Sequence, residues 1–185
     1  MKRSLIILSI LAMFMMGFST VTFAQPKDTA KSGSSSEHSM ILEGGINLPF
    51  PDGWERSESS GKAIVSLKDS KSEDKIEVYH RKMVLENSAT TLFEQFTKYL
   101  DENGLVTESE NDMKTYSLSD GNTREGRYYI HKYTSNDITI SVHSYCFTSG
   151  LHAYIVVGYF IKAEQETGVD AFDKMLGEMT LDSDN

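Results

Sequence analysis

The sequence predicts an α+β fold: an antiparallel β-sheet that ends in a C-terminal meander, with helices packed on both faces. Three observations predict it. Long strand-like runs follow one another between residues 124 and 161, and only short, turn-rich connections separate them. Both alternate faces of these runs carry apolar side chains, so both faces need a cover. Two other segments, one before and one after the runs, repeat apolar residues at helical spacing and can supply it.

The first 24 residues are expected to lie outside this fold. Lys2 and Arg3 precede an almost wholly apolar run from Leu5 to Phe18, and Thr22-Phe23-Ala24 offers small residues at the −3 and −1 positions. This is the layout of a secretory signal peptide. We expect cleavage between Ala24 and Gln25, export to the periplasm or the extracellular space, and no membrane span afterwards. An uncleaved anchor is the alternative, because the stretch up to Ala24 approaches the roughly 20 residues that a spanning helix needs.

A linker is expected to follow. Residues 25–39 are rich in Ser and contain Ala30 as their only apolar side chain, so they cannot repay the entropy of ordering. The folded domain is expected over residues 40–182, which is long enough to bury a core without disulfides. The lone Cys146 lies in a strand-like run and is expected to be a buried, inert thiol. An intermolecular disulfide or a reactive thiol is the alternative.

The chain is acidic. Its formal net charge is −9, and removal of the two positive charges of the leader would change this to −11. Binding to phosphates requires a high density of Lys and Arg. We therefore expect no nucleic-acid partner and no attraction to anionic membrane surfaces.

The domain opens with a strand-like run at 41–50 and a turn at Pro51-Asp52-Gly53. Pro51 fixes φ and Gly53 accepts a positive φ, as a tight turn requires. Trp54 follows and is expected to anchor packing, with ligand stacking as the alternative. Two strands, at 63–68 and 75–83, then flank a polar hairpin loop.

The first helix is expected to begin at a capping box formed by Thr91 and Glu94 and to end at Asn103-Gly104. Its apolar stripe consists of Leu92, Phe93, Phe96 and Leu100. The closing helix is expected over residues 167–179, with Phe172 on its apolar stripe. Both stripes are expected to be core.

Five strands are expected between the helices. Two short ones lie at 105–113 and 114–118, and the three strands of the meander lie at 124–135, 138–148 and 151–161. The two-residue turns of the meander are expected at Asn136-Asp137 and Ser149-Gly150.

These turns predict the register of the meander. A turn at Ser149-Gly150 pairs Thr148 with Leu151, and a turn at Asn136-Asp137 places His131 opposite Val142. Because successive side chains alternate between faces, His131 and His143 are expected on opposite faces of the sheet.

This order of elements resembles the PsbP-like family. The run Leu48-Pro49-Phe50-Pro51-Asp52-Gly53-Trp54 leads into a hairpin, a helix, a long meander and a closing helix, which is similar to the PsbP-like α/β/α sandwich. The stretch 153–159 followed by 172–176 is similar to the way this family ends. DcrB-type envelope proteins and Ran-binding Mog proteins share the fold. The resemblance covers about residues 40–182 and implies a protein that binds or supports other proteins, with no shared catalytic residues.

Patterns for chemistry are weak. The five histidines lack the short spacing of zinc motifs, and the chain contains no nucleophile elbow, phosphate-binding loop or dinucleotide fingerprint. Glu108, Glu110 and Asp112 would share one strand face. A solvated edge strand is expected there, and a calcium or acid–base site is the alternative. We therefore predict no catalytic residue, no metal and no cofactor.

The predicted function is an exported, non-catalytic protein-binding or assembly-support module of the cell envelope or secreted space. Its protein partner and its oligomeric state are not predicted. A small-molecule or metal-ion binding protein with a pocket near Trp54 is the alternative, and a hydrolase without a recognisable motif is a further one.

Aromatic residues of the meander are the candidate partner-binding residues, because Tyr offers a large rigid area with a polar tip. The alternative is a packed sheet face beneath a helix. Together with Trp54, the candidates are Tyr128, Tyr145, Phe147 and Tyr154.

Overall fold

The computed structural model describes residues 38–42, 45–59, 62–84, 88–106, 108–112, 115–117, 123–135, 138–161 and 165–181. The predicted leader, its cleavage site at Ala24 and Gln25, and almost all of the predicted linker lie outside the described residues. The strands are β1 (Ser39–Leu42), β2 (Ile46–Pro49), β3 (Trp54–Arg56), β4 (Val65–Asp69), β5 (Lys75–Lys82), β6 (Glu108–Asp112), β7 (Thr115–Ser117), β8 (Thr123–Ser135), β9 (Ile138–Ser149), β10 (His152–Ile161) and β11 (Thr180–Leu181). The helices are α2 (Ala89–Glu102) and α3 (Gln165–Glu178).

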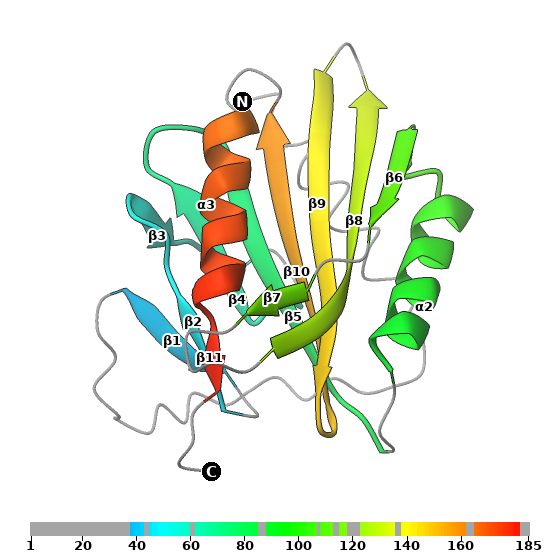
Figure 1. The fold of residues 1–185 in the computed structure, drawn as a ribbon. Helices are drawn as coiled ribbons and strands as arrows, with labels where there is room; N and C mark the ends of the chain where they lie inside the picture. The colour runs from blue at the N-terminus through cyan, green and yellow to red at the C-terminus, as the bar shows by residue number, and fades with distance from the viewer. Residues whose placement is uncertain are drawn as a thin grey trace.

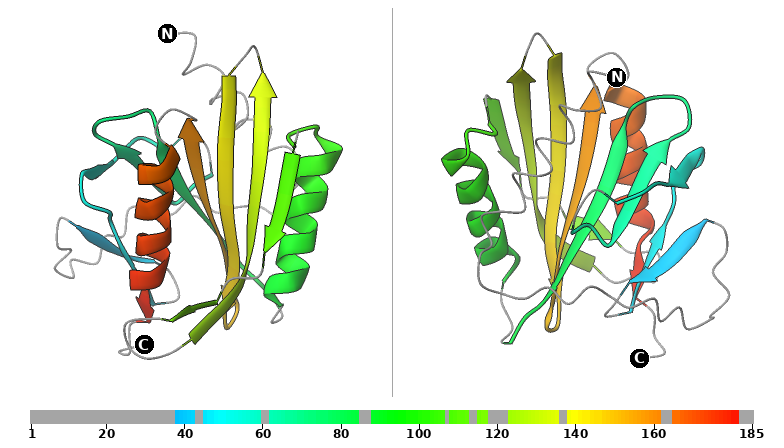
Figure 2. Two further views of the ribbon diagram at one scale, coloured as in Figure 1. Left: turned by 45° about the horizontal axis from the view of Figure 1, so that its top comes forward. Right: turned by 180° about the vertical axis from the view of Figure 1, so that it is seen from behind.

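The strands form two antiparallel sheets. The main sheet has eight strands in the order β3-β4-β5-β10-β9-β8-β6, with β7 also paired to β8, and the small sheet has the order β1-β2-β11. Helix α3 and the small sheet lie on one face of the main sheet, while α2 lies on the other (Figures 1 and 2). This confirms the predicted α+β class, with an antiparallel sheet, a C-terminal meander and helices on both faces.

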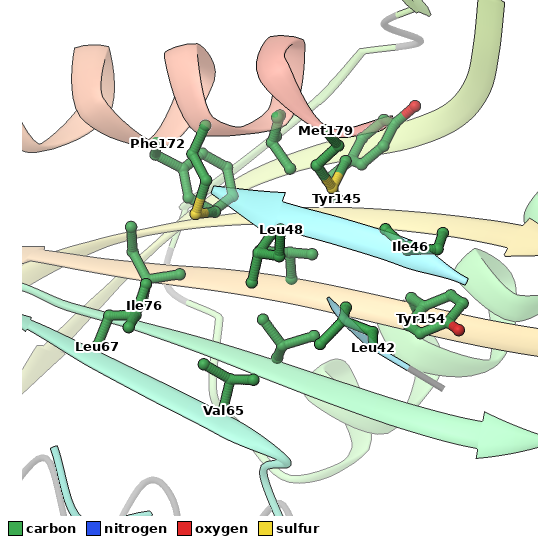
Figure 3. Close-up of a cluster of buried hydrophobic side chains, with 14 of the residues drawn as sticks. Leu42, Ile46, Leu48, Val65, Leu67, Ile76, Tyr145, Tyr154, Phe172 and Met179 are labelled. Carbon is green, nitrogen blue, oxygen red and sulfur yellow. The ribbon is translucent and has the colours of Figure 1, made fainter. Parts of the chain in front are cut away.

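Each face of the main sheet carries its own core. Beneath α3, Phe172 and Leu176 pack with the small sheet and with aromatic residues of the meander (Figure 3). Beneath α2, Phe96 and Leu100 pack on the opposite face, over residues that include Val142. Because both faces are covered, both alternations of a central strand are buried, which explains why β9 and β10 read as nearly continuous apolar runs.

The register of the meander was predicted correctly on one side and was wrong by one turn position on the other. His131 pairs with Val142 as expected. Ser149 pairs with His152, so the second turn is Gly150-Leu151 and not Ser149-Gly150. Gly150 has φ of 54°, and a two-residue hairpin turn needs a positive φ at its first central residue. The shift of the turn moves each pairing partner in β10 by two residues, so every side chain stays on its predicted face of the sheet.

The opening segment differs from its prediction. The run at 41–50 is two strands, β1 and β2, joined by a turn in which the Gly45 N–H donates to the Leu42 carbonyl at 3.1 Å. The turn at residues 51–54 is confirmed. The Trp54 N–H donates to the Pro51 carbonyl at 3.0 Å, and Gly53 has φ of 81°, as in a type II turn.

Helix α2 begins earlier than predicted. Its N-cap is Ser88, whose hydroxyl accepts from the Thr91 N–H at 3.1 Å, so the capping box of Thr91 and Glu94 was wrong. Ser88 is an equally good cap and allows one more turn of helix. The C-terminal stop is confirmed. Gly104 has φ of 64°, and the Leu105 N–H donates to the Leu100 carbonyl at 3.0 Å, which is a Schellman arrangement.

A glycine in β10 makes room for an aromatic ring. A Cβ added at Gly158 would lie 2.4 Å from Cζ of Phe160, whereas one added at Gly177 in α3 would meet nothing closer than Tyr116, at 4.0 Å. We expect Gly158→Ala to lower the free energy of unfolding by about 1–3 kcal/mol through overpacking. The matched Gly177→Ala is expected to raise it by about 0.5–1 kcal/mol, because Ala is the better helix former. Urea denaturation of the two variants checks both signs, and equal effects would contradict the packing described here.

Candidate functional site

The aromatic residues predicted as a partner-binding face are buried. Trp54 is 8% exposed, and each of the four residues of the meander is 0% exposed. They form a continuous packed layer in which Tyr154 stacks on Phe147 at 5.0 Å and Tyr128 meets Phe172 of α3 edge to face. The partner-binding assignment was therefore wrong for Trp54, Tyr128, Tyr145, Phe147 and Tyr154. The alternatives, a packed sheet face and a Trp that anchors packing, describe them correctly, because α3 and the small sheet cover this face.

A chain of hydrogen bonds runs through this layer to α3. The Tyr128 hydroxyl donates to Oδ1 of Asp173 at 3.0 Å and lies 2.9 Å from Nδ1 of His143. The other ring nitrogen of His143 lies 3.1 Å from Oγ of Ser141. Tyr116 also donates to Asp173, at 3.0 Å. Burial, reinforced by the negative charge of Asp173, raises the pKa of Tyr128, so this hydroxyl keeps its proton.

This chain contains a serine, a histidine and a carboxylate, but not in the order that hydrolysis requires. In a catalytic triad the carboxylate binds the imidazole and the imidazole binds an accessible serine. Here Asp173 reaches His143 only through Tyr128, and Ser141 is 3% exposed. The arrangement ties α3 to the sheet and does not supply a nucleophile.

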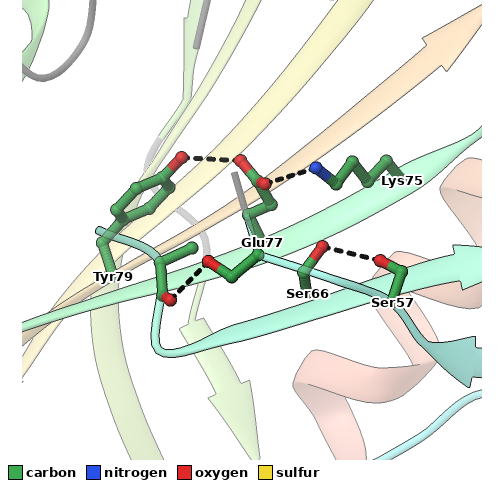
Figure 4. Close-up of polar contacts among 7 residues, drawn as sticks. Ser57, Ser66, Lys75, Glu77 and Tyr79 are labelled. Carbon is green, nitrogen blue, oxygen red and sulfur yellow. Dashed lines mark hydrogen bonds and ion pairs between the residues drawn. The ribbon is translucent and has the colours of Figure 1, made fainter. Parts of the chain in front are cut away.

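A second polar cluster lies in the other face of the sheet (Figure 4). Glu77 in β5 is fully buried, and its carboxylate binds Nζ of Lys75 at 2.6 Å and accepts from the Tyr79 hydroxyl at 2.6 Å. Burial is the main cause that raises the pKa of Tyr79, followed by the charges of Tyr159 and Glu77. A buried carboxylate is stable only when it is paired, and Lys75 and Tyr79 supply the pairing. The cluster therefore stabilises β5 within the sheet. Its sequence signal was the alternation of Lys75, Glu77 and Tyr79 on one side of a strand.

His131 is a third buried polar group. It is 4% exposed, stacks on Tyr129 at 5.3 Å, and its Nδ1 has no hydrogen-bond partner. Burial lowers the pKa of His131 to about 4, and a positive charge on His143 would lower it in the same direction. His131 is therefore a neutral core residue at physiological pH.

This burial predicts a pH dependence of stability. The unfolded chain binds a proton at His131 with the ordinary pKa of 6.5, while the folded chain binds it only near pH 4. Unfolding therefore takes up a proton between these values, and stability falls as the pH is lowered through this window. The loss amounts to about 3 kcal/mol by pH 4, at 1.36 kcal/mol per pKa unit. Above pH 6.5 this contribution is constant.

The substitution His131→Phe tests this prediction, because it keeps a ring and removes the titrating group. Urea denaturation from pH 4 to 7 should show a shallower loss of stability for the variant than for the wild type. Val84→Ala, at an exposed position without a titratable group, is the control and should follow the wild type. Parallel curves for His131→Phe and the wild type would contradict the assignment of His131 as a buried neutral base.

One end of the main sheet differs from the rest of the surface. We define the hairpin end as residues 80–84 and 149–152, which are the end of β5 and the β9–β10 turn, at the bottom of Figure 1. The Met83 N–H donates to the Leu151 carbonyl at 2.7 Å and ties the two segments together. Of the three exposed large apolar side chains among the described residues, two lie here: Val84 is 94% exposed and Leu151 is 38% exposed.

The hairpin end is also basic. Lys82 is exposed and Arg81 is half-buried, and neither residues 78–85 nor residues 138–162 contain an Asp or a Glu. His80 and His152, both half-buried, point at each other with Nε2 of His80 2.8 Å from Nδ1 of His152. The hairpin end is therefore both apolar and basic on a chain whose net charge is −9.

The remaining candidates for chemistry are accounted for. The described residues contain no group of three or more His, Cys, Asp or Glu that could hold a metal ion. Glu108 is exposed and pairs with Lys132 across the edge of the sheet at 2.8 Å, while the side chains of Glu110 and Asp112 lie outside the described set. Cys146 is buried as predicted, and burial raises the pKa of its thiol. In the described part of the chain, neither helix has the length and apolar character to cross a bilayer.

Solved structures of other proteins share this architecture. No protein-family model and no curated protein sequence matches the chain. PsbP (CyanoP) from Synechocystis sp. PCC 6803 is similar, with a TM-score of 0.54 at 13% identity over 80% of this chain and 95% of that one. The Ran-binding protein Mog1p of Saccharomyces cerevisiae is similar, with a TM-score of 0.52 at 12% identity over 80% and 96%.

A third similar structure comes from Bacteroides thetaiotaomicron, with a TM-score of 0.53 at 11% identity; the match covers 80% of this chain but only 49% of that longer one. These likenesses define the class: an α+β sandwich with a two-sided antiparallel sheet. The chain has the PsbP/Mog1-like fold, as the resemblance in its sequence indicated. At these identities the likeness describes the fold alone.

Proposed function

We propose that this chain is an exported, non-catalytic module that binds another protein of the cell envelope or the secreted space through its hairpin end. The exposure of Val84 and Leu151 beside Arg81 and Lys82 carries the proposal. Apolar side chains that stay exposed in one place are a frequent mark of interaction sites. The predicted signal peptide supports export, and the fold is shared with a Ran-binding protein, Mog1p.

The charge of the hairpin end indicates the kind of partner. Lys82 and Arg81 lie in a segment without acidic residues, on a protein that is otherwise strongly negative. A partner segment that carries Asp or Glu beside one or two apolar side chains would satisfy both features. Such a partner would be attracted to this end and repelled by the rest of the surface, which fixes the orientation of the complex.

The other functions considered have less support. A hydrolase would need an accessible nucleophile, and the only serine bound to a histidine ring among the described residues, Ser141, lies beneath α3. A pocket beside Trp54 would need an opening, but Trp54 packs in the core. The hairpin end is therefore the feature of the molecule that supports protein binding.

Affinity capture from an envelope extract tests the proposal when it compares matched charge reversals. Lys82→Glu reverses a charge at the hairpin end, and Lys98→Glu reverses an exposed one on α2. We expect a partner that the wild type and Lys98→Glu retain, that Lys82→Glu retains at least tenfold less, and that high salt releases. A captured protein that Lys82→Glu retains as well as the wild type would contradict docking at this end.

Export has its own test. Mass spectrometry of the protein recovered from the envelope or the medium should find Gln25 at its N-terminus. Recovery of the intact N-terminus from the cytoplasm would contradict export and would remove the envelope from the proposal.

A further inference from the structure

Two histidines that are far apart in the sequence meet at the hairpin end. His80 lies in β5 and His152 in β10, and these strands pair so that His80 is opposite Tyr154 while His152 is opposite Lys82. Residues opposite each other and residues two apart share a face, so both imidazoles project from the same side of the sheet. Their facing nitrogens, Nε2 of His80 and Nδ1 of His152, lie 2.8 Å apart, and their ring planes differ by only 16°.

The separation suits a metal ion as well as a proton. Of the two facing nitrogens, one donates the hydrogen bond and the other accepts it, so only one of these two nitrogens carries a hydrogen. Imidazole nitrogens bind Zn²⁺, Ni²⁺ and Cu²⁺ at about 2.0–2.1 Å, so two of them at a right angle around one ion lie about 2.9 Å apart. The two strands already hold the nitrogens near that spacing, and metal binding requires both rings to rotate about their Cβ–Cγ bonds until the two lone pairs meet at the ion.

We propose that His80 and His152 form a two-histidine site for a divalent transition-metal ion, with water at the remaining positions. The right-angle spacing is that of the tetragonal geometry which Cu²⁺ and Ni²⁺ favour, and Cu²⁺ is also the strongest binder of nitrogen sites among the first-row divalent ions. A structural zinc site needs four protein ligands, so this site is open and its metal is exchangeable.

The surroundings support an accessible site of moderate affinity. The ring of Tyr154 lies 4.9 Å from that of His80 and supports the pair from the core side. Lys82 shares the face and weakens binding through its charge, whereas Arg81 alternates to the opposite face. The site rests on the two imidazoles and not on the proposed docking, so either can fail without the other.

Two consequences follow from the geometry. Metal ions bind neutral imidazole, so protonation of either histidine competes with the metal and affinity falls in acid. A bound ion also crosslinks β5 to β10, two strands that are far apart in the sequence. Because the ion binds only the folded protein, metal should raise its thermal midpoint.

Calorimetric titration of the purified protein with Cu²⁺, and then with Zn²⁺, tests the proposal against three variants. His80→Ala and His152→Ala each remove one ligand, and His38→Ala removes an exposed histidine outside the pair. We expect one Cu²⁺ per chain, weaker binding of Zn²⁺, at least a tenfold loss of Cu²⁺ affinity in each ligand variant, and no change in His38→Ala. Electron paramagnetic resonance of the copper form should show two nitrogen ligands.

Circular dichroism checks that each variant is folded, and His152→Gln serves as a second variant that keeps a hydrogen-bonding side chain beside His80. The absence of stoichiometric Cu²⁺ binding, or binding that survives the loss of either histidine, would overturn the proposal. Partner capture that depends on Lys82 while Cu²⁺ binding is absent would leave the proposed function standing and remove only the metal site.

Discussion

Replacing Phe96 or Phe172 by Ala is expected to lower the free energy of unfolding by about 3–5 kcal/mol in each case. Phe96 is 1% exposed beneath α2, and Phe172 is 0% exposed beneath α3. The two rings belong to separate cores on opposite faces of one sheet, so each substitution leaves a cavity in a different layer. Sites without shared contacts contribute additively, so the double variant should lose about 6–10 kcal/mol.

A loss of that size exceeds the whole stability of many domains, which is about 5–15 kcal/mol, so the double variant should be largely unfolded. Urea denaturation of the single variants and circular dichroism of the double variant measure these effects. Val84→Ala is the matched control, because Val84 is 94% exposed and should change stability by less than about 0.5 kcal/mol. A Phe96→Ala variant as stable as this control would mean that α2 does not cover the second face.

The second large effect is expected at the buried carboxylate. Glu77→Leu removes the partner of Lys75 and of the Tyr79 hydroxyl, and breaking a buried ion pair from one side costs about 3–5 kcal/mol. Because the Lys75 side chain is 15% exposed, its ammonium keeps some access to water, and we expect a loss near the lower limit.

A double-mutant cycle separates the ion pair from the packing. Lys75→Met in the Glu77→Leu background removes the ammonium that faced Glu77 and should recover at least half of the lost stability, because an apolar pair can replace a buried ion pair at little cost. Thermal and urea denaturation at pH 7 measure the four proteins of the cycle. Equal stabilities for Glu77→Leu and the wild type would contradict the pairing seen in Figure 4.

Local signals in the sequence predicted much of the fold. The strand pattern and the Asn103-Gly104 stop are short-range features, and the structure contains them. The errors arose where two local choices were nearly equal in energy. Ser88 and Thr91 are both good N-caps, and Gly150 could stand first or second in its turn. In the structure Ser88 is the N-cap, and Gly150, with its positive φ, stands first in its turn.

The candidate site was harder to predict because it depends on long-range pairing. His80 and His152 are 72 residues apart and meet only because β5 lies beside β10 in the main sheet. No periodicity within either strand indicates that neighbour. The aromatic residues were misassigned for a related reason. Their alternation predicts that they share a face, but only the placement of α3 and the small sheet shows that Tyr145 and Tyr154 are covered.

We propose that the hairpin end, and not the aromatic layer, contacts a protein partner. Site-specific photo-crosslinking in intact cells checks this contact, with the photoreactive residue placed at Val84 or, as a control, at Ile41, which is 58% exposed on β1. We predict one discrete crosslinked product from Val84 in the exported fraction, much reduced when Lys82→Glu is added, and none from Ile41. Equal products from both positions, or a product from Ile41 alone, would contradict the account.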